Sequence, residues 1–325
     1  MTWRFLPVPD ALAGERVDVI VARMLGISRA QAAELVVDGG VRVAGESVAK
    51  SARPTADTVL EVELPQPAVA AAGADGPESE FGGRHGGPTS AVPVAGLTVV
   101  YRDDSVAVVD KPVGVAAHAS PGWTGPTVTG GLAALGIDLA RSGAAEREGI
   151  VHRLDVGTSG LMVVALNHQA YVSLKQQFRD RVPEKVYHAL VQGHPDPSSG
   201  TIDAPIDRHP TADHRFAVVS GGRPSITHYD TIEAFPYATL VEVHLETGRT
   251  HQIRVHFSAV RHPCCGDLTY GADPVLAKRL GLTRQWLHAK RLGFEHPASG
   301  EWVEFASEYP PDLSHALDVI AAPIR

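Results

Sequence analysis

The segment GIVHRLDVGTSGLMVVA, residues 149–165, joins a polar loop to an apolar run. Its apolar part, GLMVVAL over 160–166, is short and rich in β-branched residues, which predicts a strand buried in the middle of a sheet. The residues before it, among them His152, Arg153 and Asp155, fall on a loop that can aim side chains outward. The sequence therefore places an acid, a base and a cation together at the start of a predicted core strand.

The segments around this stretch predict a mixed sheet edged by helices. Apolar runs LTVVY and VAVVD flank the turn residues RDDS over 102–105, which predicts a hairpin. Partly alternating patterns predict further strands in EKVYHALVQG (184–193), ITHYDTIEAF (226–235) and ATLVEVHLETG (238–248). Helical spacing is seen in QAYVSLKQQFRDR (169–181) and RTHQIRVHFSAV (249–260). This order of elements indicates an α+β domain.

The bulk composition indicates a soluble protein with more than one domain. The chain has 325 residues, of which 44% are hydrophobic, enough to bury a sizeable core. No apolar run approaches the roughly 20 residues that span a bilayer, and MTWRFLPVPD lacks the features of a signal peptide. We therefore expect a cytoplasmic location without a membrane partner. The two cysteines, Cys264 and Cys265, are adjacent, which favours neither a disulfide framework nor a structural metal site.

One change in composition divides the chain. Residues 65–95 are rich in Pro, Gly, Ala and Ser and predict a flexible linker. It separates a small domain over 14–64 from a large one over 96–312. The small domain is predicted to contain two short helices followed by strands. Its segments ISRA (27–30) and DGGVRVAG (38–45) resemble the αL-type RNA-binding domain first described in a ribosomal protein. That resemblance implies that Arg29 and Arg42 contact structured RNA; the alternative is that both only solvate a surface.

Two other chemistries are conceivable for the large domain. Ser159 with His152 and Asp155 is a conceivable hydrolase triad, but the G-x-S-x-G elbow is absent and the three residues lie too close in sequence. His251 and His256 are spaced like no common zinc motif. Neither hydrolase nor metal chemistry is favoured by these patterns.

Several motifs of the large domain agree with one family. They are HRLDVGTSGL, EKVYHALVQG, TGRTHQIRVHFSAVRHPCCGDLTYG, VVDKPVGVAAH and LHAKRLGFEHPASGE, and the resemblance that they carry covers about residues 97 to 310. In their order and spacing they resemble the RNA pseudouridine synthases of the RluA/RluD type. The resemblance implies a mixed, mostly antiparallel sheet with flanking helices. It also implies an isomerase that converts uridine in RNA to pseudouridine.

The implied reaction needs a carboxylate and no cofactor. The bond from N1 to the ribose breaks and one from C5 forms, so no atom is gained or lost and no redox cofactor or metal is expected. The resemblance assigns the carboxylate to Asp155. Whether it attacks the ribose or the base, or removes a ribose proton, stays open at this point.

The resemblance assigns two further catalytic residues. Arg254 would pair with Asp155 and keep it ionised in a dry pocket; the alternative is that Arg254 contacts a phosphate. Tyr187 would stack on the uracil; the alternative is a core tyrosine. Because a paired uridine hides its glycosidic bond, the nucleotide has to be flipped or to lie in a loop.

The remaining candidates are predicted to bind RNA. They are His152, Arg153, Thr158, Lys185, Arg249, His251 and Gln252. A net charge of -8 argues against a nucleic-acid partner at first sight. Binding depends on the local field of a cleft, however, and basic residues cluster around the motifs. These are Arg153, Arg179, Arg181, Lys185, Arg208, Arg215, Arg249, Arg254 and Arg261.

Three functions follow from these observations. The preferred one is a pseudouridine synthase acting on a stem-loop of large-subunit ribosomal RNA. The alternatives are a synthase acting on transfer RNA and an RNA-binding ribosome-assembly factor with vestigial catalysis. We expect a monomer, while the target uridine and the placement of the small domain are left open by the sequence.

Overall fold

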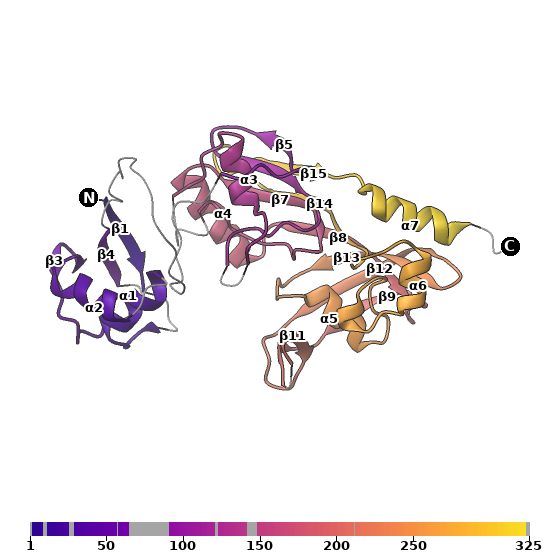
Figure 1. Cartoon of the computed structure of the whole chain (residues 1–325), viewed down its shortest axis with the longest axis horizontal. Helices are drawn as coiled ribbons and strands as arrows, with labels where there is room; N and C mark the ends of the chain where they lie inside the picture. The colour runs from indigo at the N-terminus through magenta and orange to yellow at the C-terminus, as the bar shows by residue number, and fades with distance from the viewer. Residues whose placement is uncertain are drawn as a thin grey trace, which may run out of the picture. The chain divides into compact units, whose positions relative to one another are not determined.

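The computed structural model describes residues 2–8, 12–25, 29–56, 58–64, 91–120, 123–141, 148–210 and 212–322. The chain divides into two compact units (Figure 1). The first lies within Met1–Pro88, and the second is formed by Thr89–Ser142 and Arg147–Arg325. Among the described residues, no helix combines the length and the apolar composition that crossing a membrane requires.

The first unit is a small α+β fold. Its described strands pair in the order β1 (Thr2–Pro7), β4 (Val59–Leu64), β2 (Val41–Val43) and β3 (Glu46–Ser47), all antiparallel. Its helices are α1 (Val17–Leu25) and α2 (Arg29–Val37). Ile20 and Val21 of α1 pack with Leu60 of β4 in the core. The two predicted helices are followed by β2, β3 and β4, as the sequence predicts, but a further strand, β1, precedes them.

The predicted boundaries differ from the structure at two points. β1 precedes residue 14, where the small domain was predicted to begin, yet it pairs with β4 along its whole length. A strand whose partner lies some fifty residues away leaves no local signal in the sequence. At the other end, α7 (Pro311–Ala321) extends past residue 312. The predicted linker over 65–95 falls mostly outside the described residues, since 65–90 are not among them, and stays a prediction.

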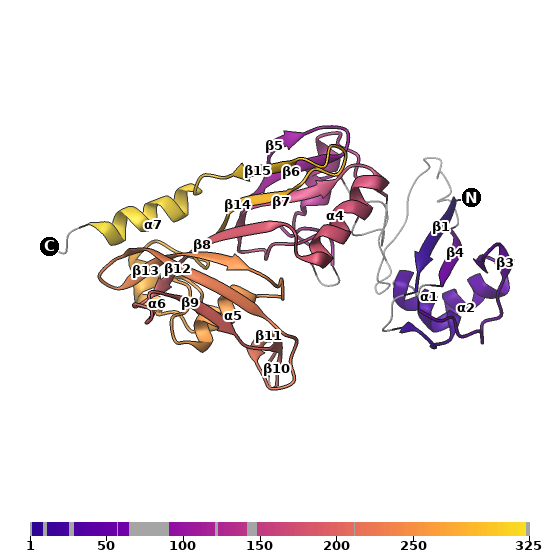
Figure 2. The same cartoon turned by 180° about the vertical axis from the view of Figure 1, so that it is seen from behind.

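The second unit is built on a mixed sheet, which within the described residues has nine strands (Figures 1 and 2). Among its described strands, only β7 and β14 pair in parallel, and the other pairs are antiparallel. The path runs through β5 (Thr98–Arg102), β6 (Val106–Lys111), β7 (Ser159–Ala165), β14 (Leu287–Glu295), β8 (Glu184–Gln192), β13 (Ala238–Leu245), β12 (Ile226–Ala234) and β9 (Ser199–Asp203). β15 (Trp302–Ala306) pairs with β14 beside this path. The predicted α+β, mostly antiparallel architecture is confirmed.

Helices and one hairpin flank this sheet. α3 (Val128–Ala134) and α4 (His168–Asp180) lie beside the half formed by β5, β6 and β7, whereas α5 (Gln252–Ala259) and α6 (Pro274–Arg279) lie beside the half formed by β9, β12 and β13 (Figures 1 and 2). β10 (Ile206–His209) and β11 (Ala212–Val218) form a separate hairpin, and Leu268–Tyr270 form a 3-10 turn. β7, β14 and β8 therefore occupy the middle of the sheet.

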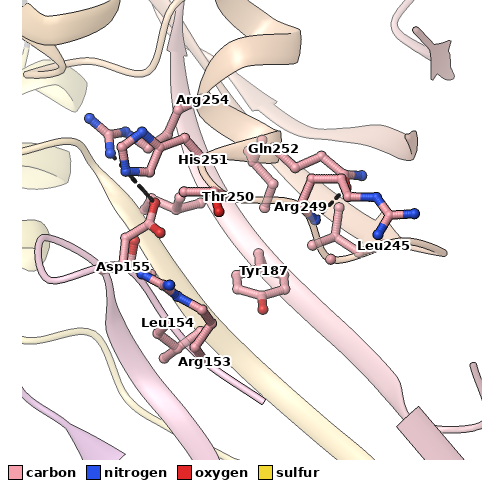
Figure 3. A pocket seen from close by; sticks show the side chains of 14 residues that line it. Arg153, Leu154, Asp155, Tyr187, Leu245, Arg249, Thr250, His251, Gln252 and Arg254 are labelled. Atoms are coloured by element: carbon pink, nitrogen blue, oxygen red, sulfur yellow. Dashed lines mark hydrogen bonds and ion pairs between the residues drawn. The ribbon is translucent and has the colours of Figure 1, made fainter. Parts of the chain in front are cut away.

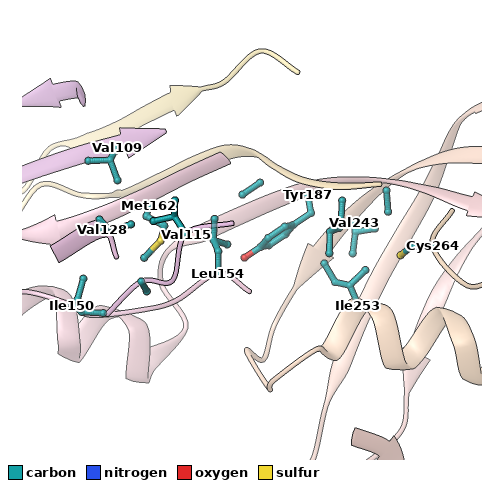
Figure 4. Packing of buried hydrophobic residues seen from close by; sticks show 14 of the residues in the cluster. Val109, Val115, Val128, Ile150, Leu154, Met162, Tyr187, Val243, Ile253 and Cys264 are labelled. Carbon is teal, nitrogen blue, oxygen red and sulfur yellow. The ribbon is translucent and has the colours of Figure 1, made fainter. Parts of the chain in front are cut away.

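Both faces of β7 are buried, as its sequence predicts. All seven of its residues are inaccessible: Met162 and Val164 face one core cluster, while Leu161 and Val163 face another with α4. The first cluster continues through Leu154 and Tyr187 to α5 (Figure 4). The loop before β7 is consequently anchored against the largest core of the unit.

The adjacent cysteines divide between two cores. Cys264 packs in the cluster that contains Tyr187, and Cys265 packs with Trp286 on the other side of the sheet. Both are free thiols, and burial raises the pKa of Cys265 to about 12. They pack as small hydrophobic residues.

Candidate active site

The loop that carries Asp155 is held close to β14 by a glycine. Gly160 has a φ of +114°, and a Cβ there would lie 2.3 Å from the carbonyl oxygen of Ala289. Only glycine lets β7 approach β14 this closely. Just before β7, residues 155–158 form a turn in which the Thr158 N–H donates to the Asp155 carbonyl at 3.0 Å. The Asp155 side chain on this turn is 15% exposed.

His152 ties the other end of this loop to β7. Its Nε2 accepts from the Val163 N–H at 3.0 Å, and its ring stacks on Phe178 with centroids 4.5 Å apart. Burial and the nearby Lys185 lower the pKa of His152 to about 3, so the ring is neutral. This residue was predicted to bind RNA; the contacts described here position the loop, and RNA binding by His152 stays a prediction.

Arg284 holds the same loop by hydrogen bonds to Gly157 and Ser159. Its Nη1 donates to the Gly157 carbonyl at 3.1 Å and its Nη2 to Ser159 Oγ at 3.3 Å. Nε and Nη2 also form a bidentate pair with Asp312 at 2.7 and 3.0 Å. Ser159 Oγ lies 3.0 Å from His288 Nδ1 as well. Ser159 Oγ thus contacts Arg284 and His288, whereas His152 Nε2 accepts from the Val163 N–H, which disfavours a triad of Ser159 with His152 and Asp155.

Lys111 supports the neighbouring loop. Its side chain is fully buried, and its Nζ donates to the carbonyls of Pro112 and Val115 at 3.0 and 2.8 Å. Burial lowers the pKa of Lys111 to about 7, an effect that the charge of Asp155 partly offsets. No role for this lysine could be derived from the sequence.

Arg254 lies between two carboxylates. Its Nη1 is 3.5 Å from Asp155 Oδ2, while Nε and Nη2 bind the two oxygens of Asp267 at 2.6 and 2.9 Å. Burial alone would lower the pKa of Arg254, but its hydrogen bonds and charge interactions with Asp267, then Asp155, raise it above the ordinary value. The guanidinium is thus fixed and permanently charged, with its nitrogens directed at two carboxylates of the protein.

Asp267 was not identified from the sequence. It is 2% exposed and sits in the HPCCGD segment, whose match to the family pattern was the only signal available. Its backbone is held by turn hydrogen bonds with Cys264 and Tyr270. The bidentate geometry leaves the third nitrogen of Arg254 directed at Asp155.

His251 also approaches the Asp155 carboxylate. Its Nε2 lies 3.8 Å from Asp155 Oδ2, and its Nδ1 is 2.7 Å from the Tyr270 hydroxyl. The Tyr270 ring in turn lies 4.8 Å from the guanidinium carbon of Arg254. Figure 3 shows the side chains of Arg254 and His251 converging on Asp155. Burial lowers the pKa of His251, an effect that the charge of Asp155 partly offsets.

Tyr187 on β8 forms part of the same pocket. It is 8% exposed and packs in the core cluster with Leu154. Burial, and then the charge of Asp155, raise the pKa of its hydroxyl, so the phenol stays protonated. In Figure 3 its ring lies between Asp155 and Arg249. The tyrosine is therefore a core residue and a pocket wall at once.

Gln252 and Thr158 are occupied by the protein itself. The Gln252 side chain accepts from Thr247 Oγ1 and from the Arg249 N–H, and donates to the Ile226 carbonyl and Thr227 Oγ1. These contacts hold the loop before α5, and RNA binding by Gln252 stays a prediction. Thr158 Oγ1 accepts from Gln285 Nε2 at 3.3 Å.

These residues surround two adjoining pockets. The first, which we call the catalytic pocket, has a volume of about 70 Å³ (Figure 3). Its lining includes Arg153, Asp155, Thr158, Tyr187, Leu245, Arg249, His251, Gln252 and Arg254. The second, which we call the basic groove, has a volume of about 380 Å³ and shares Arg153, Tyr187, Leu245, Gly248 and Arg249 with the first. A ligand in the groove can thus extend into the catalytic pocket.

The groove concentrates positive charge on an acidic protein. The residues that line the groove include five cations and one acid, Glu246. The cations are Arg153, Arg179, Arg181, Lys185 and Arg249. Burial, and then Arg181, lower the pKa of Lys185. Of the other basic residues predicted to cluster here, Arg208 and Arg215 lie on the β10–β11 hairpin and Arg261 follows α5. The net charge of -8 therefore does not describe the field at this site.

The two arginines predicted in the small unit lie on different elements. Arg29 begins α2, and its Nε donates to Asp18 at 3.2 Å. Arg42 lies on β2, opposite Glu61 of β4. The hydrogen bonds from Arg16, and then Arg29, lower the pKa of Asp18 to about 2 despite its burial. RNA binding by either arginine stays a prediction.

Two family models match the chain. Residues 105–259 match the RNA pseudouridylate synthase model, and residues 15–57 match the S4 domain model. The first match contains Asp155, Tyr187 and Arg254, and the second contains α1 and α2.

Named relatives match over nearly the full length. An uncharacterized RNA pseudouridine synthase of Mycobacterium bovis is 57% identical, over 98% of this chain and 99% of that protein. The ribosomal large subunit pseudouridine synthase D of Xanthomonas campestris is 38% identical, over 96% and 91%. Among solved structures, human RNA pseudouridylate synthase domain containing 1 superposes with a TM-score of 0.55 and 32% identity, over 68% of this chain and 87% of that one.

Proposed function

Because this chain belongs to the RNA pseudouridine synthases, we propose that it isomerises a uridine of large-subunit ribosomal RNA, with Asp155 as its catalytic carboxylate. The enzyme class itself, an isomerase that converts uridine in RNA to pseudouridine, follows from the family. The observation that supports the catalytic assignment is the pairing of Asp155 with the fixed guanidinium of Arg254 in the pocket bounded by Tyr187.

The reaction needs a charged carboxylate at the sugar or the base. The N1–C1′ bond breaks, C5 bonds to C1′, the hydrogen on C5 is lost and N1 gains one, so the atoms balance without a redox partner. Attack on the ribose, attack on the base and removal of a ribose proton all use an ionised oxygen of Asp155. Arg254 favours that ionised form, because an opposite charge stabilises a carboxylate that desolvation would protonate.

Tyr187 holds the detached base by stacking. We expect Tyr187→Phe to retain most of kcat/KM and Tyr187→Leu, which keeps an apolar side chain but no ring, to lose about tenfold. The loss corresponds to the roughly 1–3 kcal/mol of a base–aromatic stack. Single-turnover rates of pseudouridine formation measure both variants. Equal rates for the leucine and phenylalanine variants would contradict stacking by Tyr187.

The basic groove binds the phosphates next to the flipped nucleotide. If its five cations each neutralise one phosphate of a single-stranded segment, the logarithm of the binding constant falls against log salt with a slope of about -3.5. Fluorescence anisotropy of a labelled stem-loop at several salt concentrations gives this slope. We expect Arg179→Gln to reduce the magnitude of this slope by about 0.7. A binding constant of the native protein that does not change with salt would contradict phosphate binding in the groove.

Ribosomal RNA is the preferred substrate class for two reasons. The full-length relatives of Xanthomonas campestris and Neisseria meningitidis are named ribosomal large subunit pseudouridine synthases. The chain also carries an S4 domain with exposed Arg29 on its second helix. A synthase acting on transfer RNA would share the catalytic pocket and differ only in how the RNA is selected.

The substrate class is tested with purified protein and transcripts that carry tritium at C5 of uridine. Release of tritium reports the loss of the C5 hydrogen. We expect release from large-subunit ribosomal RNA and none from transfer RNA. Release from transfer RNA alone would support the second candidate, and RNA binding without release from either would support an assembly factor.

A further inference from the structure

A third pocket adjoins the segment that carries Asp155. It has a volume of about 70 Å³ and shares Arg153 and Leu154 with the catalytic pocket. Its other lining residues are Ala116, Ala117, His118, Ser120, Trp123 and Val156. Arg153 is exposed and lines this pocket, the catalytic pocket and the basic groove. A strand of RNA that passes Arg153 can therefore reach all three.

Trp123 is held in a fixed orientation at this pocket. A Cβ added to Gly125 would lie 2.5 Å from the indole ring, which means that the ring rests directly on the glycine backbone. The indole N–H donates to the Pro126 carbonyl at 3.2 Å. Within the part of the chain that the structure describes, no aromatic or cationic side chain stacks on this ring. The tryptophan is thus preorganised and only half-buried.

The chemistry of the third pocket suits a nucleobase. Ala117, Leu154 and Val156 supply apolar walls, and the indole supplies an aromatic plate. Ser120 and Arg153 place polar groups among the same lining residues, where the edge of a base or its phosphate can bind. When a uridine leaves its stack, the nucleotide beside it loses a stacking partner, so a new plate next to the catalytic pocket offsets that loss.

We propose that the third pocket binds the nucleobase that flanks the isomerised uridine, stacked on Trp123, with Arg153 at the phosphate that links the two nucleotides. This subsite rests on the proposed function, since it presumes a flipped uridine in the catalytic pocket. With this subsite, Trp123 favours RNA substrates in which the nucleotide beside the target uridine can also leave its stack.

The test combines protein variants with modified RNA. Trp123→Ala removes the aromatic ring, and Trp123→Phe keeps one. The control is Trp302→Ala. Trp302 lies on β15, and its exposed indole also rests on a glycine, Gly293. Each protein is assayed on a ribosomal stem-loop and on the same RNA with an abasic site 5′ or 3′ of the target. On intact RNA we expect Trp123→Ala to raise KM about tenfold with kcat within twofold. The phenylalanine and Trp302 variants are expected to stay near native.

The abasic RNA separates base binding from a merely structural tryptophan. If Trp123 stacks on the flanking base, the native protein and Trp123→Ala have the same KM on RNA abasic at that one position. If Trp123→Ala raises KM by the same factor on abasic RNA as on intact RNA, at both the 5′ and the 3′ position, the proposed subsite is wrong. Failure of the native protein to act on intact RNA would instead overturn the proposed function, so the two failures are distinguishable.

Discussion

Replacing Asp155 by asparagine is expected to lower the rate of pseudouridine formation by at least about a thousandfold, the size of effect typical for loss of a catalytic acid, base or nucleophile. Asparagine has nearly the same shape but cannot carry the charge that attack or proton removal requires. Single-turnover assays with C5-tritiated RNA measure the loss. Binding of the RNA is expected to change little, because the groove cations are untouched.

The fold is not expected to suffer from this change. The Asp155 side chain is partly exposed, and its ion pair with Arg254 is the longer of the two that the arginine makes. Thermal unfolding of Asp155→Asn therefore serves as the control. A variant that keeps a rate within tenfold of native would contradict the role of Asp155, whatever its stability.

Replacing Asp267 by asparagine is expected to impair both stability and catalysis. The change leaves the buried guanidinium of Arg254 with a neutral partner, and breaking a buried ion pair from one side costs about 3–5 kcal/mol. Arg254 also loses the bidentate contact that directs its third nitrogen at Asp155. We expect kcat to fall about a hundredfold at temperatures where the variant is still folded, the size of effect seen when partners that orient a site are removed.

The matched control for Asp267 is Glu304→Gln. Glu304 also pairs with an arginine, Arg291, at 3.6 Å, but about half of its side chain is exposed. Exposed ion pairs contribute about 0–1 kcal/mol to stability. We therefore expect the free energy of unfolding of Glu304→Gln to lie within about 1 kcal/mol of the native value, and its activity to be retained. Denaturant unfolding together with single-turnover rates measures both variants. Equal stabilities would contradict the buried clamp on Arg254.

Much of the architecture could be predicted because its signals are local. GLMVVAL has the composition of a doubly buried strand, and β7 is buried on both faces. The RDDS turn between two apolar runs is the turn of the β5–β6 hairpin. The pairing of Asp155 with Arg254 could also be anticipated, although only from resemblance to a family, because nearly a hundred residues separate the two in the sequence.

The rest depends on contacts between distant residues, which carry no local signal. Asp267 and Arg284 read as ordinary charged residues until the fold places them against Arg254 and the Gly157 carbonyl. Gln252 shows another kind of contact that the sequence does not reveal: it is predicted to bind RNA, which stays a prediction, and its amide makes four hydrogen bonds within the protein. Only the folded arrangement distinguishes a group that is free from one that is occupied.

A map of pseudouridines in ribosomal and transfer RNA from cells that lack this gene tests the central claim most directly. The gene is then restored in its native form or as Asp155→Asn. We expect one or more pseudouridines of large-subunit ribosomal RNA to disappear in the deletion and to return only with the native protein. An unchanged map, or a site that Asp155→Asn restores as fully as the native protein does, would contradict the account.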